Sequence, residues 1–354
     1  MSVDRPRRSR HTVNSRDIAR AAGVSQSTVS RVINDRPGVK PETREHVLRT
    51  IRERGFIVDA TARSLLTGRS NLLGLIVSNI TNPFYAEVTQ AVARTAFAHG
   101  YNLILGNTEE LPDRQAAYLD LLMQHRVDGV IMASSVEGTG DLIAPVVEVG
   151  FPLVLVNRVL ENLPIDSVTT DNLAAGEQAT LHLLDHGHTR IAYVGGRPDT
   201  TTNRDRLTGY RNALAERGVG FDERLVSDGD FTRESGYARV RALLADGAVT
   251  AVVGGDDTIA FGCMDAVAAA SLRVPEDVAV VGFDDVALAS MRSVSLTSVR
   301  QPTEEMGGSA VEMLIERIGA EGDAPARHIV LPAEMWRRRS CGCPAEANDP
   351  LGDE

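Results

Sequence analysis

The sequence predicts an all-α helix-turn-helix domain at the N-terminal end of the chain, followed by an α/β domain of two similar lobes. Residues 14–34 have the pattern of two short helices joined by a glycine-containing turn. From Leu72 onward, short runs of Val, Ile and Leu alternate with helical stretches, which is typical of parallel βαβ units. The charge changes in the same region: residues 1–70 contain 15 Lys or Arg and 7 Asp or Glu, a net charge of +8, although the whole chain carries −11.

Composition and charge exclude several classes of protein. Residues 71–354 carry the remaining −19, which should confine contacts with a polyanion to the basic end. No apolar run approaches the length of about 18 residues that a membrane span requires, and the basic N-terminus lacks the apolar segment of a signal peptide. The three cysteines fit a reducing compartment. We therefore expect a cytoplasmic, nucleoid-associated protein with no membrane partner.

The first helix of the predicted motif has clear boundaries. Asn14 is a good N-cap, and Asp17, three residues later, can complete a capping box. Ile18, Ala19 and Ala22 form an apolar face at helical spacing. Gly23 stands where a left-handed backbone would end this helix.

The second helix has an apolar face and a face of base-reading residue types. Ser25 can cap it, and Val29, Val32 and Ile33 face inward. The outward residues are Gln26, Ser27, Thr28, Ser30 and Arg31. Arginine suits guanine, glutamine suits adenine, and hydroxyls suit a base or a phosphate. A short αα-hairpin with a polar face is the alternative, but the local positive charge favours binding to double-stranded DNA.

The flanking segments complete the expected N-terminal organisation. Residues 1–11 form a basic arm, which could contact phosphates or could serve as a solubilising tail. The DNA-binding domain spans residues 12–58, and its third helix, Pro41–Arg54, should place Val47, Leu48 and Ile51 inward. A short helix over Asp59–Thr67, within a 59–69 linker, should need DNA or a partner chain to form.

The remaining domain, residues 70–340, has apolar runs that predict two blocks of four strands. The runs are 72–77, 101–105, 127–132 and 153–156, then 190–194, 224–227, 250–253 and 278–281. We expect the chain to cross between lobes near Asp171 and to return near Gln301–Met306. The lobes would then comprise about 71–171 with 301–330, and about 172–300 with 331–340. Residues 341–354 are expected to be a disordered tail.

Polar residues follow these strands, at the edge where open α/β sheets bind ligands. Two lobes with such ends facing each other predict a cleft for a polar small molecule. The strands near residues 250 and 280 are followed by paired carboxylates: Asp256, Asp257, Asp284 and Asp285. These could perform acid/base catalysis, but no nucleophile or metal motif accompanies them. We therefore expect Asp256 and Asp284 to bind ligand hydroxyls, and we expect no enzyme.

Two further groups of residues have spacings that suggest metal binding. His182, His186 and His188 lack a third carboxylate or cysteine in register, so a structural role is favoured. Cys341 and Cys343 offer only two ligands and are treated as incidental. Neither a GxGxxG nor a GxxxxGK[ST] motif occurs, so the sequence predicts no metal and no cofactor.

Taken in order, the motifs resemble the lac repressor family of bacterial transcription regulators over about residues 12–340. They are IARAAGVSQSTVSRVIN, TARSLLTGRS, GLIVSNITNPFY, RVDGVI, HGHTRIAYVGG, RLTGY, LRVPEDVAVVGFDD and LTSVRQPTEEMG. The resemblance implies a helix-turn-helix domain joined to a periplasmic-binding-protein-like domain, in a homodimeric repressor that reads a pseudo-palindromic operator. Gln26, Ser27 and Arg31 match base-reading positions, with Ser25, Thr28 and Arg63 as further DNA contacts. Leu65 matches a hinge-helix leucine that wedges into a central CpG step.

The resemblance also implies an effector site between the two lobes. The matching positions are Phe84, Tyr85, Asn157, Arg204, Asp256, Asp284 and Gln301. Aromatic faces with convergent amide, arginine and carboxylate groups suit a sugar or sugar derivative. A purine or nucleoside effector is the second reading, and a sugar-binding or sugar-processing protein without a regulatory role is the third.

The chain departs from the family pattern at three places. Lys40 replaces a capping residue before Pro41, Val58-Asp59 replaces Pro-Asn before the hinge, and Asp256 stands where many members have Asn. The first two changes put hinge stability and operator affinity in question. The third means that the effector cannot be copied from a relative.

Overall fold

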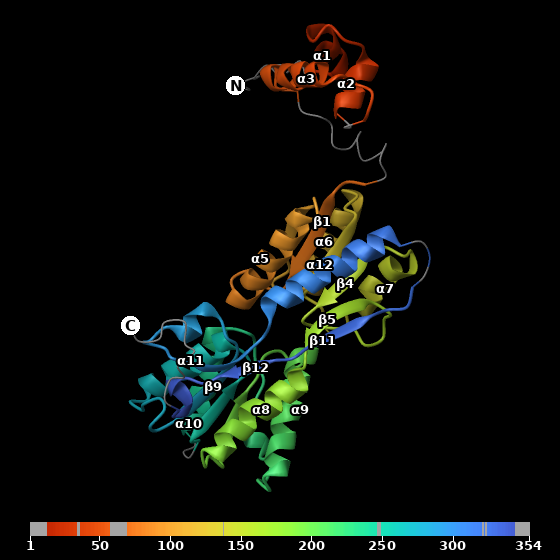
Figure 1. Ribbon diagram of the computed structural model, residues 1–354. Coiled ribbons are helices and arrows are strands. Elements are labelled where there is room, and N and C mark those ends of the chain that lie inside the picture. The colour runs from red at the N-terminus through yellow and green to blue at the C-terminus, as the bar shows by residue number, and fades with distance from the viewer. Residues whose placement is uncertain are drawn as a thin grey trace, which may run out of the picture. The chain divides into compact units, whose positions relative to one another are not determined.

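The computed structural model describes residues 13–33, 36–56, 69–136, 138–245, 249–320, 322 and 324–343. The chain forms two compact units, residues 1–70 and 71–354 (Figure 1). The predicted basic arm, the hinge helix with Arg63 and Leu65, and residues 344–354 of the predicted tail lie outside the described residues. The prediction of disorder is wrong for residues 341–343, because a short helical turn over Arg339–Cys341 buries Cys341. Within the described part, no helix has the length and apolarity needed to cross a membrane.

The first unit contains three helices around one small core. They are α1 (Ser15–Ala21), α2 (Gln26–Ile33) and α3 (Pro41–Arg54). The predicted capping box is confirmed: the Asn14 amide donates to Asp17 Oδ2 over 3.1 Å, and the Asp17 amide donates to Asn14 Oδ1 over 3.1 Å. Gly23 has φ +65° after α1, as expected. Ile18, Val29 and neighbouring apolar side chains then pack the helices together.

Helix α3 differs from its prediction on one face. Val47 is buried, but Leu48 is 39% exposed and Thr50 is buried in its place. A helix turns about 100° per residue, so Val47 and Thr50 share the inner face while Leu48 is rotated away from it. Lys40 makes no side-chain capping bond at the start of this helix, and Gly55 ends it with φ +60°.

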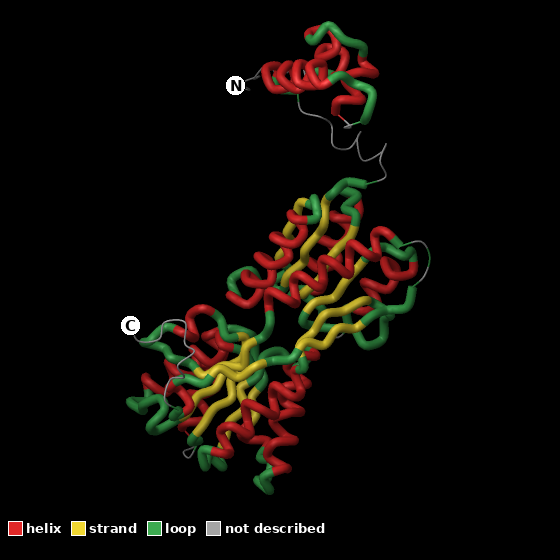
Figure 2. Tube along the Cα trace, viewed as in Figure 1, coloured by secondary structure: helices red, strands yellow, loops and turns green. Residues whose placement is uncertain are grey.

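The first sheet of the second unit is entirely parallel, with strand order β11-β5-β4-β3-β1-β2. Its strands are β1 (Leu72–Val77), β2 (Asn102–Asn107), β3 (Gly129–Ala133), β4 (Leu153–Val156), β5 (Asp166–Thr170) and β11 (His328–Leu331). Its helices are α5 (Pro83–Ala98), α6 (Pro112–Gln124), α7 (Gly140–Glu148) and α12 (Thr303–Gly319). We call this layer the first lobe; its strands lie between helices in Figure 2.

The second sheet has the order β12-β10-β9-β8-β6-β7, and only β12 is antiparallel to its neighbour. Its strands are β6 (Ile191–Val194), β7 (Val226–Ser227), β8 (Ala251–Gly254), β9 (Ala279–Asp284), β10 (Thr297–Arg300) and β12 (Glu334–Trp336). Its helices are α8 (Asn172–Asp185), α9 (Thr201–Glu216), α10 (Arg233–Ala245) and α11 (Asp257–Ala269), with short 3₁₀ helices η1 (Glu223–Leu225), η2 (Ala287–Ser290) and η3 (Arg339–Cys341). We call this layer the second lobe.

The chain passes between the lobes three times: after β5, after β10 and after β11. Strands β5, β10, β11 and β12 were not predicted. Segments such as DSVTT and EMW are short and mix polar with apolar residues, so they lack the continuous apolar run that identifies a buried strand.

Glycines let two helix pairs of the second lobe approach closely. A Cβ on Gly209 of α9 would overlap the carbonyl oxygen of Leu173 in α8, and one on Gly176 would overlap that of Arg206. The pair α10 and α11 repeats this device at Gly236 and Gly262. Each contact is between backbones, which cannot move aside as a flexible side chain can.

Gly209→Ala should therefore lower the free energy of unfolding by about 1–3 kcal/mol, the usual cost of overpacking. Gly220→Ala is the matched control, because a Cβ there meets nothing within 4 Å. Urea unfolding followed by circular dichroism measures both changes. Equal urea midpoints for Gly209→Ala and the wild type would show that stability does not depend on the close backbone approach of α8 and α9.

Candidate functional site

The carboxyl ends of both sheets meet at one polar cavity between the lobes. It is lined by Asn82, Phe84, Tyr85, Asn157, Arg158, Thr202, Arg206, Phe231, Asp256, Asp284 and Gln301. Six of the seven residues expected from the sequence are among them, and Arg204 is not. The cavity measures about 20 Å³, which is room for about one water molecule. The lobes are thus closed on each other, and a larger ligand requires them to separate.

The first lobe contributes an aromatic wall at the start of α5. Asn82 is the N-cap, accepting from the Phe84 amide over 3.1 Å, and Pro83 begins the helix. The Phe84 and Tyr85 rings follow, edge to face with centroids 5.1 Å apart. Burial raises the pKa of the Tyr85 hydroxyl, against the attraction of Arg158. This hydroxyl therefore stays protonated and can donate a hydrogen bond.

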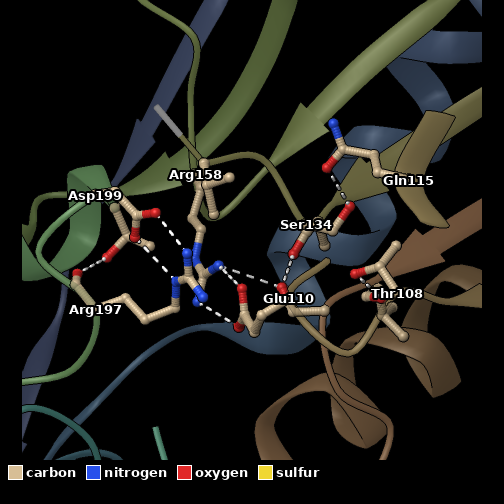
Figure 3. Close-up of polar contacts among 12 residues, drawn as sticks. Thr108, Glu110, Gln115, Ser134, Arg158, Arg197 and Asp199 are labelled. Atoms are coloured by element: carbon tan, nitrogen blue, oxygen red, sulfur yellow. Dashed lines mark hydrogen bonds and ion pairs between the residues drawn. The ribbon is translucent and has the colours of Figure 1, made fainter. Parts of the chain in front are cut away.

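Arg158, immediately after β4, is a buried cation that the sequence reasoning did not assign. Its guanidinium donates to both oxygens of Glu110, over 2.7 and 3.1 Å, and to Ser78 Oγ over 3.3 Å. Figure 3 shows it between Glu110 and the pair of Arg197 and Asp199. Burial by itself would lower the pKa of Arg158, but Tyr85 and Glu110 raise it above its ordinary value. The cavity thus keeps a permanent positive charge.

The four carboxylates after β8 and β9 divide into two kinds. Asp256 and Asp284 line the cavity, whereas Asp257 and Asp285 do not. Asp257 accepts from Ser298 Oγ over 2.6 Å and from the Val286 amide over 2.9 Å. In each pair, the first residue faces the cavity and the second is held by the sheet and the segments beside it.

Asp256 joins the two lobes. One oxygen accepts from the Ile259 amide over 2.7 Å and caps α11, and the other accepts from Asn82 Nδ2 over 2.9 Å. Asn82 belongs to the first lobe, so this bond is a direct clasp across the cavity. Burial raises the pKa of Asp256, which is the usual cost of placing a carboxylate out of water.

Asp284 is held in an unusual backbone conformation, with φ +100°. It accepts from Gln301 Nε2 over 2.6 Å, and Arg206 Nη2 lies 3.8 Å away. Burial raises its pKa to about 8, although Arg206 opposes the rise. Near neutral pH the carboxyl is therefore largely protonated in the closed form.

The arginine of α9 that lines the cavity is Arg206, so the prediction of Arg204 is wrong. Arg204 pairs with Glu161 of the first lobe and with Asp205. Arg206 donates to Asn172 Oδ1 over 2.8 Å and to the Gly255 carbonyl over 2.6 Å. Two positions along a helix rotate a side chain by about 200°, so only one of the two arginines can face the cavity.

Two buried acceptors in the cavity have no partner among the described residues: Asn157 Oδ1 and Gln301 Oε1. Buried polar atoms are nearly always hydrogen-bonded. These two oxygens are therefore available to hydroxyl or N–H donors of a ligand.

Helix α2 displays the residues expected to read bases. Ser25, Gln26, Ser27 and Arg31 are exposed and Thr28 is half-buried. The Thr28 amide donates to Ser25 Oγ over 3.1 Å, which confirms Ser25 as the cap. Gln26 Nε2 donates to Ser15 Oγ over 2.9 Å, so this side chain is already oriented.

The three histidines do not act as one group. His188 Nδ1 lies 3.1 Å from Thr250 Oγ1, whereas the His182 and His186 rings contact each other, with centroids 4.4 Å apart and planes tilted by 55°. Burial, with His186 and Arg337 close by, lowers the pKa of His182 to about 4. Its ring is therefore neutral at physiological pH.

Comparison with known proteins covers both units. The family model described as "Bacterial regulatory proteins, lacI family" matches residues 16–59, and "Periplasmic binding proteins and sugar binding domain of LacI family" matches residues 70–337. The ribose operon repressor of Escherichia coli is 37% identical over 306 residues, which cover 86% of this chain and 92% of the repressor.

Two solved structures are similar to this chain over nearly its whole length. A complex of the transcriptional regulator CelR with cellobiose has a TM-score of 0.70 and 36% identity, covering 93% of this chain and 99% of that one. The lac repressor dimer bound to operator and the anti-inducer ONPF has a TM-score of 0.82 and 25% identity, with the same coverage.

The raised pKa of Asp284 predicts a pH dependence of stability. An unfolded aspartate titrates near pH 4, so between there and about pH 8 the folded state binds a proton that the unfolded state does not. The free energy of unfolding should fall as pH rises through this range, by up to about 1.4 kcal/mol per pH unit for each such proton. Asp284→Asn should make the decline shallower.

Urea unfolding between about pH 5 and pH 8 measures this slope. Asp222→Asn is the control, because its hydrogen bonds with Arg224 lower the pKa of Asp222 and move its titration below the range. An Asp284→Asn variant with the wild-type slope would show that Asp284 is ionised throughout.

Proposed function

The chain belongs to the lacI family of bacterial regulatory proteins, and we propose that it is a repressor that binds a pseudo-palindromic operator as a homodimer and responds to a sugar or sugar derivative. Its relatives are DNA-binding transcription regulators. The observation that carries the proposal is the closed polar cavity on a chain that also presents an exposed, capped second helix.

On the DNA side, Gln26, Ser27 and Arg31 would contact base edges, while Ser25 and Thr28 would contact phosphate or sugar. All lie on or beside α2. The apolar face of this helix packs against α1 and α3. The proposal also includes Arg63 and Leu65, whose roles rest on the sequence motif alone. The homodimer and operator are supported by the likeness to the lac repressor dimer bound to operator.

On the effector side, the cavity offers hydrogen-bond acceptors, together with the donors Arg158 and Arg206, beside aromatic rings. Asp256, Asp284 and the unpartnered Asn157 and Gln301 oxygens would accept from ligand hydroxyls. Phe84 and Phe231 supply apolar surface for the faces of a sugar ring. The regulator CelR is similar to this chain and was solved with cellobiose, which supports a carbohydrate; a purine or nucleoside remains the competing class.

Coupling would follow from the closure of the lobes. A ligand that replaces the bond between Asn82 and Asp256 changes the relative stability of open and closed forms. If the two forms differ in how they present the DNA-binding units of a dimer, effector and operator share a coupling free energy, typically about 1–3 kcal/mol.

Selection from a random DNA library with full-length protein tests the proposal directly. We expect a palindrome with a central CpG step. Repeating the selection with a panel of sugars, purines and nucleosides distinguishes an inducer, which weakens recovery, from a corepressor, which strengthens it. Recovery of no motif under any of these conditions would refute sequence-specific operator binding.

Arg31→Ala should relax base preference at one position of each half-site and weaken operator binding by about 1–3 kcal/mol. Arg241→Ala removes the same charge from the exposed face of α10 and should leave the preference unchanged. Fluorescence anisotropy with operators mutated one base pair at a time measures both. If Arg31→Ala weakens all sequences equally, this arginine contacts phosphate rather than a base.

Asp284→Asn should weaken effector binding about 2- to 10-fold and should spare operator affinity. The carboxyl is largely protonated in the closed form, and a net hydrogen bond between neutral groups contributes roughly 0.5–1.5 kcal/mol. Asp120→Asn on the exposed face of α6 is the control. Calorimetric titration with the effector found by the selection gives the affinities. Undiminished binding by Asp284→Asn would remove this residue from the site.

A further inference from the structure

The C-terminal segment of the described chain is anchored in the second lobe. Arg338 is buried and donates to Asp285 Oδ1 over 2.6 Å, and the Ser340 hydroxyl donates to the Val280 carbonyl over 2.5 Å. Cys341 is buried after them, and Gly342 turns the chain with φ +92°. Cys343 is thereby placed at the C-terminal end of α8.

Three side chains that can ligate a metal meet there. His182 lies in the last turn of α8 and His186 caps it, four residues later and therefore on the same face. Cys343 Sγ lies 3.7 Å from His182 Nε2 and 3.2 Å from His186 Nε2. The ligand atoms of all three lie within 4.8 Å of one another.

The hydrogen bonding of His186 presents the correct nitrogen to this cluster. Its Nδ1 lies 2.8 Å from the His182 carbonyl oxygen, and because a carbonyl only accepts, Nδ1 must carry the proton. In the neutral ring, Nε2 then has its lone pair free on the side of Cys343. Histidine ligands are characteristically oriented in this way, through a second N–H donated to a carbonyl or carboxylate.

We propose that His182, His186 and Cys343 bind one thiophilic divalent cation of the zinc type. Zinc binds nitrogen at about 2.0–2.1 Å and thiolate sulfur at about 2.3 Å, so tetrahedral geometry separates sulfur and nitrogen ligands by roughly 3.5 Å. The two observed separations, 3.7 and 3.2 Å, bracket that value. Two imidazoles and a thiolate favour zinc over magnesium or calcium, which prefer oxygen ligands.

Binding would proceed by simple ligand exchange. The cation loses bound waters, Cys343 releases its thiol proton to solvent, and one water remains in the fourth position. The bound ion would join the end of α8 to a residue 157 positions after His186. It would act as a structural cross-link that holds the C-terminal segment, including Arg338, against the second lobe.

Cobalt substitution in the full-length, untagged protein tests the site. After treatment with a chelator, one equivalent of Co²⁺ should give a thiolate-to-cobalt charge-transfer absorption, and Zn²⁺ should abolish it by displacement. Cys343→Ser should remove this absorption and weaken Zn²⁺ binding at least about tenfold. His186→Asn should weaken Zn²⁺ binding to a similar extent. His188→Asn is the matched control, because His188 contacts Thr250 instead.

Circular dichroism and operator binding establish that each variant is folded. Absence of the charge-transfer band in the wild type, or equal Zn²⁺ affinity in Cys343→Ser, would overturn the proposal. Hydrogen exchange provides a second measurement that needs no variant. Zn²⁺ should slow exchange of the amides of residues 339–343 in the wild type, and an unchanged rate would equally contradict the site.

Discussion

A carboxylate buried in a protein must be hydrogen-bonded, and the polar cavity depends on how Asp257 and Asp285 meet this requirement. Asp285 is bonded by Arg300 and Arg338, and Asp257 by Ser298 and the Val286 amide. These partners come from β10, from the loop after β9 and from the C-terminal segment. Because each of these residues is fixed, its neighbour, Asp256 or Asp284, has a defined position at the cavity. The second lobe thus uses one carboxylate of each pair to orient the other.

The first lobe meets these carboxylates through contacts of different strength. The bond between Asn82 and Asp256 is buried, and so is the Arg158 guanidinium, 5.1 Å from the Phe231 ring centroid. The pair of Arg204 and Glu161 is much more exposed, and exposed ion pairs contribute at most about 1 kcal/mol. The buried contacts therefore contribute most to holding the lobes closed, and Arg204 adds only a weak outer contact.

Local signals made the first unit predictable. The capping box of Asn14 and Asp17 and the left-handed Gly23 involve residues only a few positions apart, and each was found as expected. In the second unit, buried strands such as LVLV were recognisable because both of their faces are apolar. Strand β12 was not, because it lies at the edge of its sheet, has only three residues and begins with an exposed glutamate.

The wrong and missed sequence predictions share one physical cause. Neighbouring residues in the sequence do not determine where a side chain points or which distant residues it contacts. Motif position alone did not distinguish Arg204 from Arg206, although the two side chains point in nearly opposite directions from their helix. Leu48 was assigned inward although the turn of α3 places Thr50 there. No spacing rule could connect His186 with Cys343, because only the folded course of the C-terminal segment brings them together.

The discontinuous first lobe has a consequence for synthesis on the ribosome. Its core includes Met306, Ala310 and Leu314 from α12 and Leu331 from β11, all of which follow strands β6 to β10 of the second lobe in the chain. The nascent first lobe therefore has an incomplete apolar surface until almost the whole chain has emerged. The four α-helices and strands β6 to β10 of the second lobe are made before α12, so this lobe can begin to fold during translation. The first lobe must wait for α12 and β11, and its contacts are distant in sequence and therefore form slowly.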